Sequence, residues 1–448
     1  MTAAANKHPN RATADDWPPE SSRGWPVIRL RFCATVNPSR SELNGLPEDT
    51  EVSFVPMESV CEYGGLRLDQ TKPLADVSTG YTYFRDGDVV VAKITPCFEN
   101  GKGSIAQGLT GGVGFGTTEL HVLRPTPRLD PAFLFYLTIS HPFRSIGAAY
   151  MYGAGGQKRV PDEFVRDFRH PIPTIDKQRA IAAILDRETA RIDALIEKKR
   201  RQIELLHEKR AALISHAVTK GLDPTAPMKD SGIDWLGKIP THWVPIRFKR
   251  CIKFITSGPR GWAEYFSDDG ELFIRIGNLN RDSIDLDLSD VQHVAPPIGA
   301  EAIRTRVHAG DILVSITADL GSVAVVPPRV ETAYISQHIA LARPMGKVSH
   351  PRWLGYSIFS DCCRNQLRAL GYGGTKIQLG LEDVQNLVLC LPPHEEQKRI
   401  VSWLNIETGK QSQAIQKVYE SISTLREYRT ALISAAVTGK IDVREPAA

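Results

Sequence analysis

The sequence predicts an α+β protein in which two similar globular regions are separated by two long helices that form an antiparallel coiled coil. Two observations carry this prediction. A segment of 47 residues occurs twice, at 173–219 and 392–438, with a constant offset of 219 and 19 identical positions. Within each copy, apolar residues recur at alternating steps of four and three, which is the heptad spacing of a coiled-coil seam. A period this long is not typical of a solenoid, so the chain is interpreted as a tandem duplication with pseudo-twofold symmetry.

The heptad positions identify the side chains that should pair the two helices. They are Leu185, Ile192, Ile196, Ile203, Leu206 and Leu213 in the first copy, and Leu404, Ile415, Val418, Ile422, Leu425 and Leu432 in the second. Each helix of about 40 residues would be roughly 60 Å long, at about 1.5 Å per residue. Polar residues also occur on the seam, so one alternative is that each helix lies on the surface of a globular region. Two similar heptad copies in one chain favour pairing, and tandem copies most simply pair antiparallel.

The globular regions alternate short β-rich runs with Gly- and Pro-rich turns, as at Val89–Ala92 and Ile312–Ser315. The repeat continues into these regions, because Gly87-Asp88 before the first run is matched by Gly310-Asp311 before the second. The predicted boundaries are a disordered tail at 1–24, a globular region at 25–174, a helix at 175–219, a linker at 220–242, a second globular region at 243–392, a helix at 393–438 and a tail at 439–448.

Composition and charge limit the class of protein. Hydrophobic residues make up 42% and charged residues 24% of the 448 residues, which is typical of a soluble globular chain. The apolar runs are too short to span a membrane and residues 1–23 do not resemble a secretory signal, so a cytoplasmic protein is expected. With 55 basic and 51 acidic residues the net charge of +4 neither requires nor excludes a nucleic-acid partner. The seven cysteines have no Cys-x-x-Cys or zinc-ligand spacing, and no metal site is expected.

Catalytic motifs are missing from the sequence. It has no Gly-x-x-x-x-Gly-Lys-Ser/Thr, Asn-Pro-Pro-Tyr, Gly-x-Ser-x-Gly or His-Glu-x-x-His run. Asp162 and the Glu-Lys-Lys run at 197–199 have the residue types of a nuclease site, but the run lies on the first long helix, where such residues normally form a solvated face. The chain is therefore expected to be non-catalytic.

Binding chemistry remains. Glycine-rich loops with basic residues occur at matching places near the end of each globular region, at 153–159 and 371–376. Glycine lets backbone amides approach a phosphate, and lysine or arginine adds positive charge. An incidental surface turn is the alternative, and the duplication favours binding. A third loop, at 256–262, has arginine and tryptophan at its tip and is expected to be exposed. The candidate binding residues are Tyr150, Gln157, Lys158, Arg159, Arg260, Trp262, Tyr372, Thr375 and Lys376.

These residues resemble the specificity subunit of type I restriction–modification systems, over nearly the whole chain after Trp25. The run Ser-Gly-Ile-Asp-Trp-Leu-Gly-Lys-Ile-Pro-Thr-His-Trp at 231–243 resembles the opening of a target-recognition domain in this family. Residues 52–60 and 273–279 resemble its early strands. Gly-Gly-Thr-Lys at 373–376, followed by Leu-Pro-Pro-His-Glu-Glu-Gln at 391–397, resembles its end and the start of the following helix. The first copy departs from this pattern at 171–178, and has Gln157 where the second has Thr375.

The resemblance implies that each globular region is a target-recognition domain that reads one half of a split, asymmetric sequence in double-stranded DNA. The paired helices would set the gap between the half-sites and dock two adenine-methyltransferase subunits, which restriction subunits would join. S-adenosylmethionine, ATP and magnesium would bind those partners, and no cofactor would bind this chain. Lys158, Arg159 and Lys376 are expected to contact the DNA backbone, and Arg260 to lie near a groove. A duplicated coiled-coil scaffold that binds other proteins without recognising DNA is the alternative.

Overall fold

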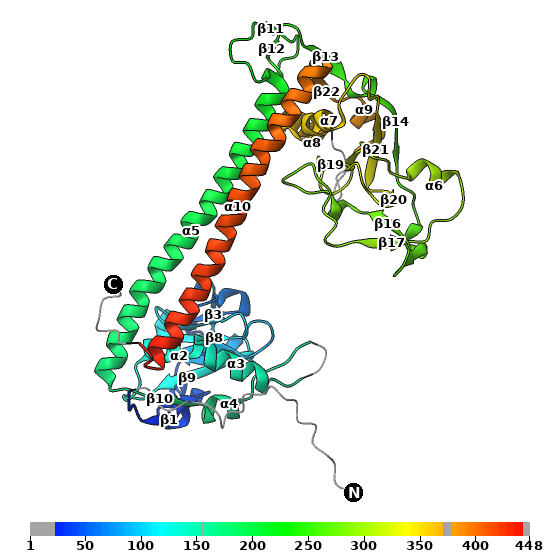
Figure 1. The fold of residues 1–448 in the computed structure, drawn as a ribbon. Helices are drawn as coiled ribbons and strands as arrows, with labels where there is room; N and C mark the ends of the chain where they lie inside the picture. Colours follow the sequence, from blue (N-terminus) through cyan, green and yellow to red (C-terminus); the bar gives the residue numbers. More distant parts are fainter. Residues whose placement is uncertain (1–22, 154–155, 371–377, 442–448) are drawn as a thin grey trace. The chain divides into compact units, whose positions relative to one another are not determined.

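The computed structural model describes residues 23–153, 156–370 and 378–441. The chain divides into two compact units: unit 1 contains residues up to 198 and those from 420 onward, and unit 2 contains residues 199–419. Each unit combines a sheet-rich region with part of both long helices, α5 (Ile175–Lys220) and α10 (His394–Val437) (Figure 1). The predicted α+β class, with two sheet-rich regions and two long helices, is confirmed.

The sheet-rich region of unit 1 contains two four-stranded sheets, ordered β2-β9-β6-β7 and β4-β3-β8-β5. β3 and β8 pair in parallel, and the remaining pairs of these two sheets are antiparallel. Strand β6 consists of four apolar residues that are all buried, which explains its central position. The elements are β1 (Val27–Arg29), β2 (Ala34–Val36), β3 (Glu51–Val55), β4 (Thr71–Pro73), α1 (Leu74–Val77), β5 (Thr82–Arg85), β6 (Val89–Ala92), β7 (Gly103–Ile105), β8 (Val113–Gly116), β9 (Leu120–Pro125), α2 (Pro131–Ile139), α3 (His141–Tyr150), α4 (Asp162–Asp167) and β10 (Arg169–Pro171).

Unit 2 repeats the strand order of the first sheet, while the parallel pair of its second sheet lies at one edge and not in the centre. Its four-stranded sheets are ordered β14-β21-β18-β19 and β15-β17-β16-β20, again with one parallel pair, β16 with β20. The elements are β11 (Met228–Asp230), β12 (Lys238–Pro240), β13 (Val244–Arg247), β14 (Ile252–Ser257), β15 (Phe266–Ser267), β16 (Glu271–Ile274), β17 (Gln292–Val294), α6 (Ala300–Thr305), β18 (Ile312–Ser315), β19 (Val323–Val325), β20 (Ala333–Ile335), β21 (Ile339–Pro344), α7 (Pro351–Phe359), α8 (Asp361–Leu370), α9 (Leu381–Gln385) and β22 (Val388–Leu391). The segment expected to be a linker, 220–242, carries the β11–β12 hairpin.

The two long helices pack against each other in antiparallel directions within each unit. In unit 1, Leu185 of α5 shares a core with Ile433 of α10, and in unit 2 Ile214 shares a core with Leu404. Most of the heptad positions are buried: Leu185, Ile192, Ile196, Ile203, Leu404, Ile415, Val418 and Ile422. The others are half-buried: Leu206, Leu213, Leu425 and Leu432. The predicted coiled-coil pairing is therefore observed in both units.

Gln178, in the first turn of α5, fastens that helix to the sheet-rich region of unit 1. Its Nε2 donates to the carbonyls of Pro173 (2.8 Å) and Arg128 (3.0 Å), and its Oε1 accepts from the backbone N–H of Asp130 (2.8 Å). The side chain is completely buried. A buried amide with all of these partners is strongly position-specific, which explains why glutamine recurs at this place in the repeat.

Gln397 makes the equivalent bonds at the start of α10 in unit 2. Its Nε2 donates to the carbonyls of Pro392 (2.9 Å) and Val348 (3.3 Å), and its Oε1 accepts from the N–H of His350 (2.8 Å). Each long helix is thus attached at its start to the sheet-rich region that precedes it in the chain.

The end of each long helix is attached to the sheet-rich region from the other half of the sequence. Ser434 of α10 accepts a hydrogen bond from the N–H of His141, the first residue of α3, at 3.0 Å. Ser215 of α5 accepts one from the N–H of Asp361, the first residue of α8, at 3.1 Å. The first N–H groups of a helix have no partner within that helix, so these serines satisfy them. This exchange explains why each compact unit contains segments from both halves of the chain.

At the end of each long helix, a tryptophan ring packs against a glycine. A Cβ on Gly439 would lie 3.0 Å from the ring of Trp25, and one on Gly221 would lie 3.3 Å from the ring of Trp243. Both glycines have positive φ (73° and 79°), so a side chain would be disfavoured there in any case. In unit 1 the Nε of Arg23 also donates to the carbonyl of Gly439 at 2.8 Å.

Candidate nucleic-acid interface

The loop that follows α3 in unit 1 presents polar side chains on a fixed backbone. Tyr152 and Arg159 exchange backbone hydrogen bonds (3.2 and 2.9 Å), and the N–H of Thr95 donates to the carbonyl of Lys158 at 3.0 Å. Gly153 allows the tight approach, because a Cβ there would lie 2.6 Å from the carbonyl oxygen of Gln157. The side chains of Gln157 and Lys158 are exposed. This geometry suits contact with a phosphate or a base edge.

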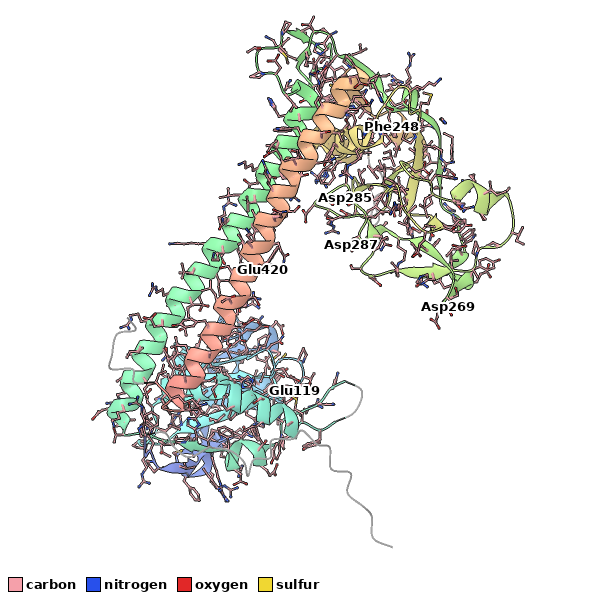
Figure 2. All side chains as sticks on the ribbon, viewed as in Figure 1. Glu119, Phe248, Asp269, Asp285, Asp287 and Glu420 are labelled. Atoms are coloured by element: carbon pink, nitrogen blue, oxygen red, sulfur yellow. The ribbon has the colours of Figure 1, made fainter. Side chains whose placement is uncertain are left out.

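Arg159 has an acidic partner, Glu119, which directly precedes β9. Glu119 is labelled in Figure 2. The Nη2 of Arg159 lies 2.7 Å from Oε1 of Glu119, and its Nε lies 2.9 Å from Oε2. These hydrogen bonds lower the pKa of the Glu119 carboxyl. The guanidinium group therefore contributes less net positive charge than the sequence pattern indicates, and Lys158 is the more available cation of the two.

The aromatic residues of this loop differ in exposure. The ring of Tyr150 packs against Phe164, with ring centroids 5.5 Å apart. Tyr152 is more exposed, with 68% of its surface accessible. Tyr152 is the aromatic side chain better placed for stacking on a base, although the sequence pattern favours Tyr150. Exposed aromatic residues two positions apart cannot be ranked without knowledge of what packs beneath them.

The matching loop of unit 2 lies outside the described residues. This applies to Tyr372, Thr375 and Lys376. Their assignment as DNA contacts stays a prediction.

The third candidate loop contains one exposed residue and one buried residue. Arg260 is exposed, as expected. The expectation that Trp262 lies at an exposed tip is wrong, because only 3% of its surface is accessible. Its ring contacts those of Phe273 and Tyr334, with centroids 6.2 and 5.5 Å apart. These partners come from β16 and β20, and burial of a large aromatic surface outweighs the polar character of the surrounding loop.

The sequence patterns did not identify Arg304 as a candidate. Its Nη1 donates to the hydroxyl of Thr256 and to the carbonyl of Ser257 (3.2 Å), so α6 is attached to the end of the strand that leads to Arg260. About half of the Arg304 side chain is exposed. The sequence contains a weak signal, since two arginines occur in the run Ile-Arg-Thr-Arg at 303–306.

Comparison with known proteins shows which proteins this chain resembles. Residues 300–419 match the family described as the type I restriction modification DNA specificity domain. The chain is 41% identical over 173 residues to the type I restriction enzyme EcoEI specificity subunit of Escherichia coli. It is 38% identical over 169 residues to the EcoAI specificity subunit of the same organism. The matches cover 38% and 37% of this chain, and 29% and 28% of those relatives.

Solved structures extend the likeness to nearly the whole chain. A chain from a structure of a type I R-M system covers 95% of this chain with a TM-score of 0.72 at 19% identity, and 100% of that chain is matched. The HsdS subunit from Thermoanaerobacter tengcongensis covers 95%, with a TM-score of 0.54 at 19% identity, and is also matched over 100% of its length. This chain is HsdS-like in its fold. At 19% identity, these solved structures show that the HsdS-like chain shares their fold.

A longer but weaker sequence match agrees with this assignment. The HsdS-like chain is 24% identical over 461 residues to the putative type I restriction enzyme MjaX specificity subunit of Methanocaldococcus jannaschii. That match covers 93% of this chain and 100% of the relative. Among the described residues, no helix combines the length and apolar character needed to cross a membrane.

Proposed function

We propose that this HsdS-like chain is the sequence-specific DNA-binding subunit of a type I restriction–modification complex. The observation that carries the proposal is the match of residues 300–419 to the DNA specificity domain, which covers much of unit 2. The matching strand order of the sheet β2-β9-β6-β7 in unit 1 and the sheet β14-β21-β18-β19 in unit 2 supports the same role for unit 1. Each unit would read one half of a bipartite site in double-stranded DNA.

The two half-sites are proposed to differ. The anchoring residues of the repeat are duplicated, as with Gln178 and Gln397, whereas the two matching glycine-rich loops differ in sequence, with Gln157 in the first where the second has Thr375. Unit 1 presents Gln157, Lys158 and Tyr152, whereas unit 2 presents Arg260. Base edges in the major groove are distinguished by the pattern of donors and acceptors that a protein offers, so unlike loops should read unlike sequences. Lysine contacts to phosphate would position each unit without reading sequence.

The long helices are proposed to set the gap between the half-sites and to dock partner subunits. Exposed apolar side chains on these helices, including Leu205 and Ile406, are available for docking. The proposed partners are two adenine-methyltransferase subunits and the restriction subunits of the complex. S-adenosylmethionine, ATP and magnesium would then be bound by those partners, and this chain would itself be non-catalytic and cytoplasmic.

Methylation mapping tests the proposal. The chain would be co-produced with an adenine-methyltransferase subunit encoded beside it, and modified adenines would be mapped across a genome by single-molecule sequencing. We expect a split motif with two unlike halves and a fixed gap of roughly six to eight base pairs, since half-sites one helical turn apart are about 34–36 Å apart. An intact, cofactor-supplied complex that methylates nothing would instead favour the scaffold alternative.

A second experiment tests the phosphate contacts. The slope of log Kd against log salt concentration measures the number of phosphates neutralised, at about 0.9 per phosphate for duplex DNA. Replacing Lys158 and Lys376 together by glutamine should reduce that slope by about 1.8, the amount expected for the loss of two phosphate contacts. An unchanged slope would remove these lysines from the interface, while the motif found by methylation mapping would stand.

A further inference from the structure

Two isoleucines in one short segment of unit 2 are exposed to an unusual degree. Ile298 is fully exposed, and 77% of the surface of Ile303 is accessible. Isoleucine is among the residues most often buried in proteins. Single exposed apolar side chains are common, but two that are this exposed within six residues are available to a partner surface.

The helix that carries Ile303 is anchored in unit 2. Pro296 and Pro297 restrict the backbone before Ile298. Helix α6 follows, and its Ala302 packs on the buried aromatic cluster that contains Trp262. Thr305, near the end of the same helix, is completely buried and donates from Oγ1 to a carbonyl one turn earlier. The inner face of α6 is therefore fixed in the core of unit 2, while Ile303 points outward.

Basic residues outnumber acidic residues in the segment of the two isoleucines and in the loop attached to it. The segment 295–306 and the loop 258–265 together contain Arg260, Arg304 and Arg306, all exposed, against the acidic Glu264 and Glu301. Glu301 lies 3.7 Å from Arg304 and partly neutralises it. The hydrogen bond from Arg304 to the carbonyl of Ser257 (3.2 Å) attaches α6 to the strand that leads to Arg260. A small apolar tip among arginines suits the polyanionic groove of DNA better than an apolar protein surface.

We propose that Ile298 and Ile303 form a wedge that inserts between base pairs from the minor groove of the DNA bound by unit 2. The inference rests on the proposed function, because it assigns a mode of contact to the same DNA. Proteins that bend DNA place isoleucine, leucine, phenylalanine or proline between base steps and flank them with basic residues. The wedge partly unstacks one step, and the arginines hold the phosphates on either side. Unit 2 would thereby select its half-site partly by the ease with which that step opens.

The test uses the full-length chain and a fluorescent duplex. The duplex would carry the motif found by methylation mapping, with 2-aminopurine at successive positions of the half-site read by unit 2 and a dye pair at its ends. Wild type should brighten 2-aminopurine at one step and bend the duplex by roughly 20–90°. The double variant Ile298→Ala/Ile303→Ala should lose both signals and bind about tenfold more weakly, with an unchanged salt slope, because the phosphate contacts remain.

Val244→Ala is the matched control, since Val244 is an exposed β-branched residue of unit 2 outside this segment. It should leave fluorescence, bend and affinity at wild-type values. Duplex binding by the double variant with wild-type fluorescence and bend would overturn the wedge and leave the proposed function intact. If wild type itself bound no duplex in a salt-dependent way, the proposed function would fail first, and the wedge with it.

Discussion

Arg343 binds both carboxylate oxygens of Asp311, with Nε 2.8 Å from Oδ1 and Nη2 2.7 Å from Oδ2. Unit 1 contains the equivalent pair, in which Nε and Nη2 of Arg124 lie 2.8 Å from Oδ1 and Oδ2 of Asp88 respectively. In each unit the aspartate precedes a central strand and is 1% exposed, and the arginine lies near the end of a neighbouring strand. The Gly-Asp sequence that recurs in the two halves is thus half of a duplicated buried ion pair.

Removing one partner of this pair should destabilise unit 2 strongly. Asp311→Asn would leave a partly buried guanidinium without its counter-charge, at a cost of about 3–5 kcal/mol. Hydrogen–deuterium exchange should show faster exchange in β18 and β21, with the strands of unit 1 as an internal control. Asp290→Asn breaks a pair with Arg275 in which the aspartate is 91% exposed. That control should cost less than about 1 kcal/mol. Equal effects of the two variants would contradict the prediction.

Truncating the helix-anchoring glutamines should loosen the helix starts. Gln178→Ala and Gln397→Ala each leave buried backbone groups without a partner, which costs about 1–3 kcal/mol per group. The amides of the first turns of α5 and α10 should exchange faster in the corresponding variant. Gln202→Ala, at an exposed position of α5, is the control and should leave exchange unchanged. Unaltered protection in Gln178→Ala would mean that these hydrogen bonds do not hold the helix.

The two arginines on the helix seam have different partners, which allows a stabilising substitution. Arg429 lies 3.3 Å from Asp193 in unit 1. Arg210, at the equivalent position, donates to the hydroxyl of Ser412 at 2.6 Å in unit 2. Burial lowers the pKa of Arg210, so a carboxylate at this site should favour its charged form. We expect Ser412→Asp to raise the free energy of unfolding of unit 2 by about 0.5–1 kcal/mol.

A double-mutant cycle with Arg210→Met isolates this interaction from other effects of the new aspartate. The gain from Ser412→Asp should disappear in the Arg210→Met background. A gain of the same size in both backgrounds would assign the effect to the helix itself.

Acid should destabilise unit 1 through one histidine. His170 is completely buried, and its Nε2 lies 2.9 Å from the carbonyl oxygen of Val437 on α10. Burial lowers its pKa to about 4 from an ordinary value near 6.5. Because the folded pKa is lower, the unfolded chain binds more protons between these values. The free energy of unfolding therefore has its full value above about pH 6.5. It decreases by about 3 kcal/mol as the pH falls toward about 4.

Denaturant unfolding at pH 7.5 and pH 5 measures this dependence. His170→Gln should flatten the pH dependence of unit 1, whereas His141→Gln, at an exposed position, should retain it. A wild-type dependence that survives in His170→Gln would assign the acid sensitivity to other groups.

The helices and the duplication could be predicted from the sequence because their signals are local and periodic. Heptad spacing places Leu185 and Leu404 on one face of each helix without knowledge of the remaining chain. The Gly-Asp repeat also pointed to a shared structural role, although its arginine partner was not recognised. The partner lies 36 residues later in unit 1 and 32 residues later in unit 2, and pairing between strands brings the two side chains together.

The loops that would contact DNA could be predicted only in part. Sequence pattern located the loop with Lys158 and the exposed Arg260, since glycine and basic residues mark such turns. It placed Trp262 on the surface because the neighbouring residues are polar, whereas strands distant in the sequence bury its ring. It also missed Arg304 and the exposed Ile298, because burial depends on packing that a single sequence does not display.

The serines at the helix ends have a consequence for how such a chain can change over generations. Ser215 and Ser434 each complete the unit built mainly from the opposite half of the sequence. A substitution in one copy of the repeat is therefore selected for its fit to residues of the other half. The two copies must stay similar where they anchor, while the loop with Lys158 and the loop with Arg260 are free of that mutual constraint. Substitutions in these loops can therefore change the contacts of one unit without disturbing the helix ends that connect the two halves of the chain.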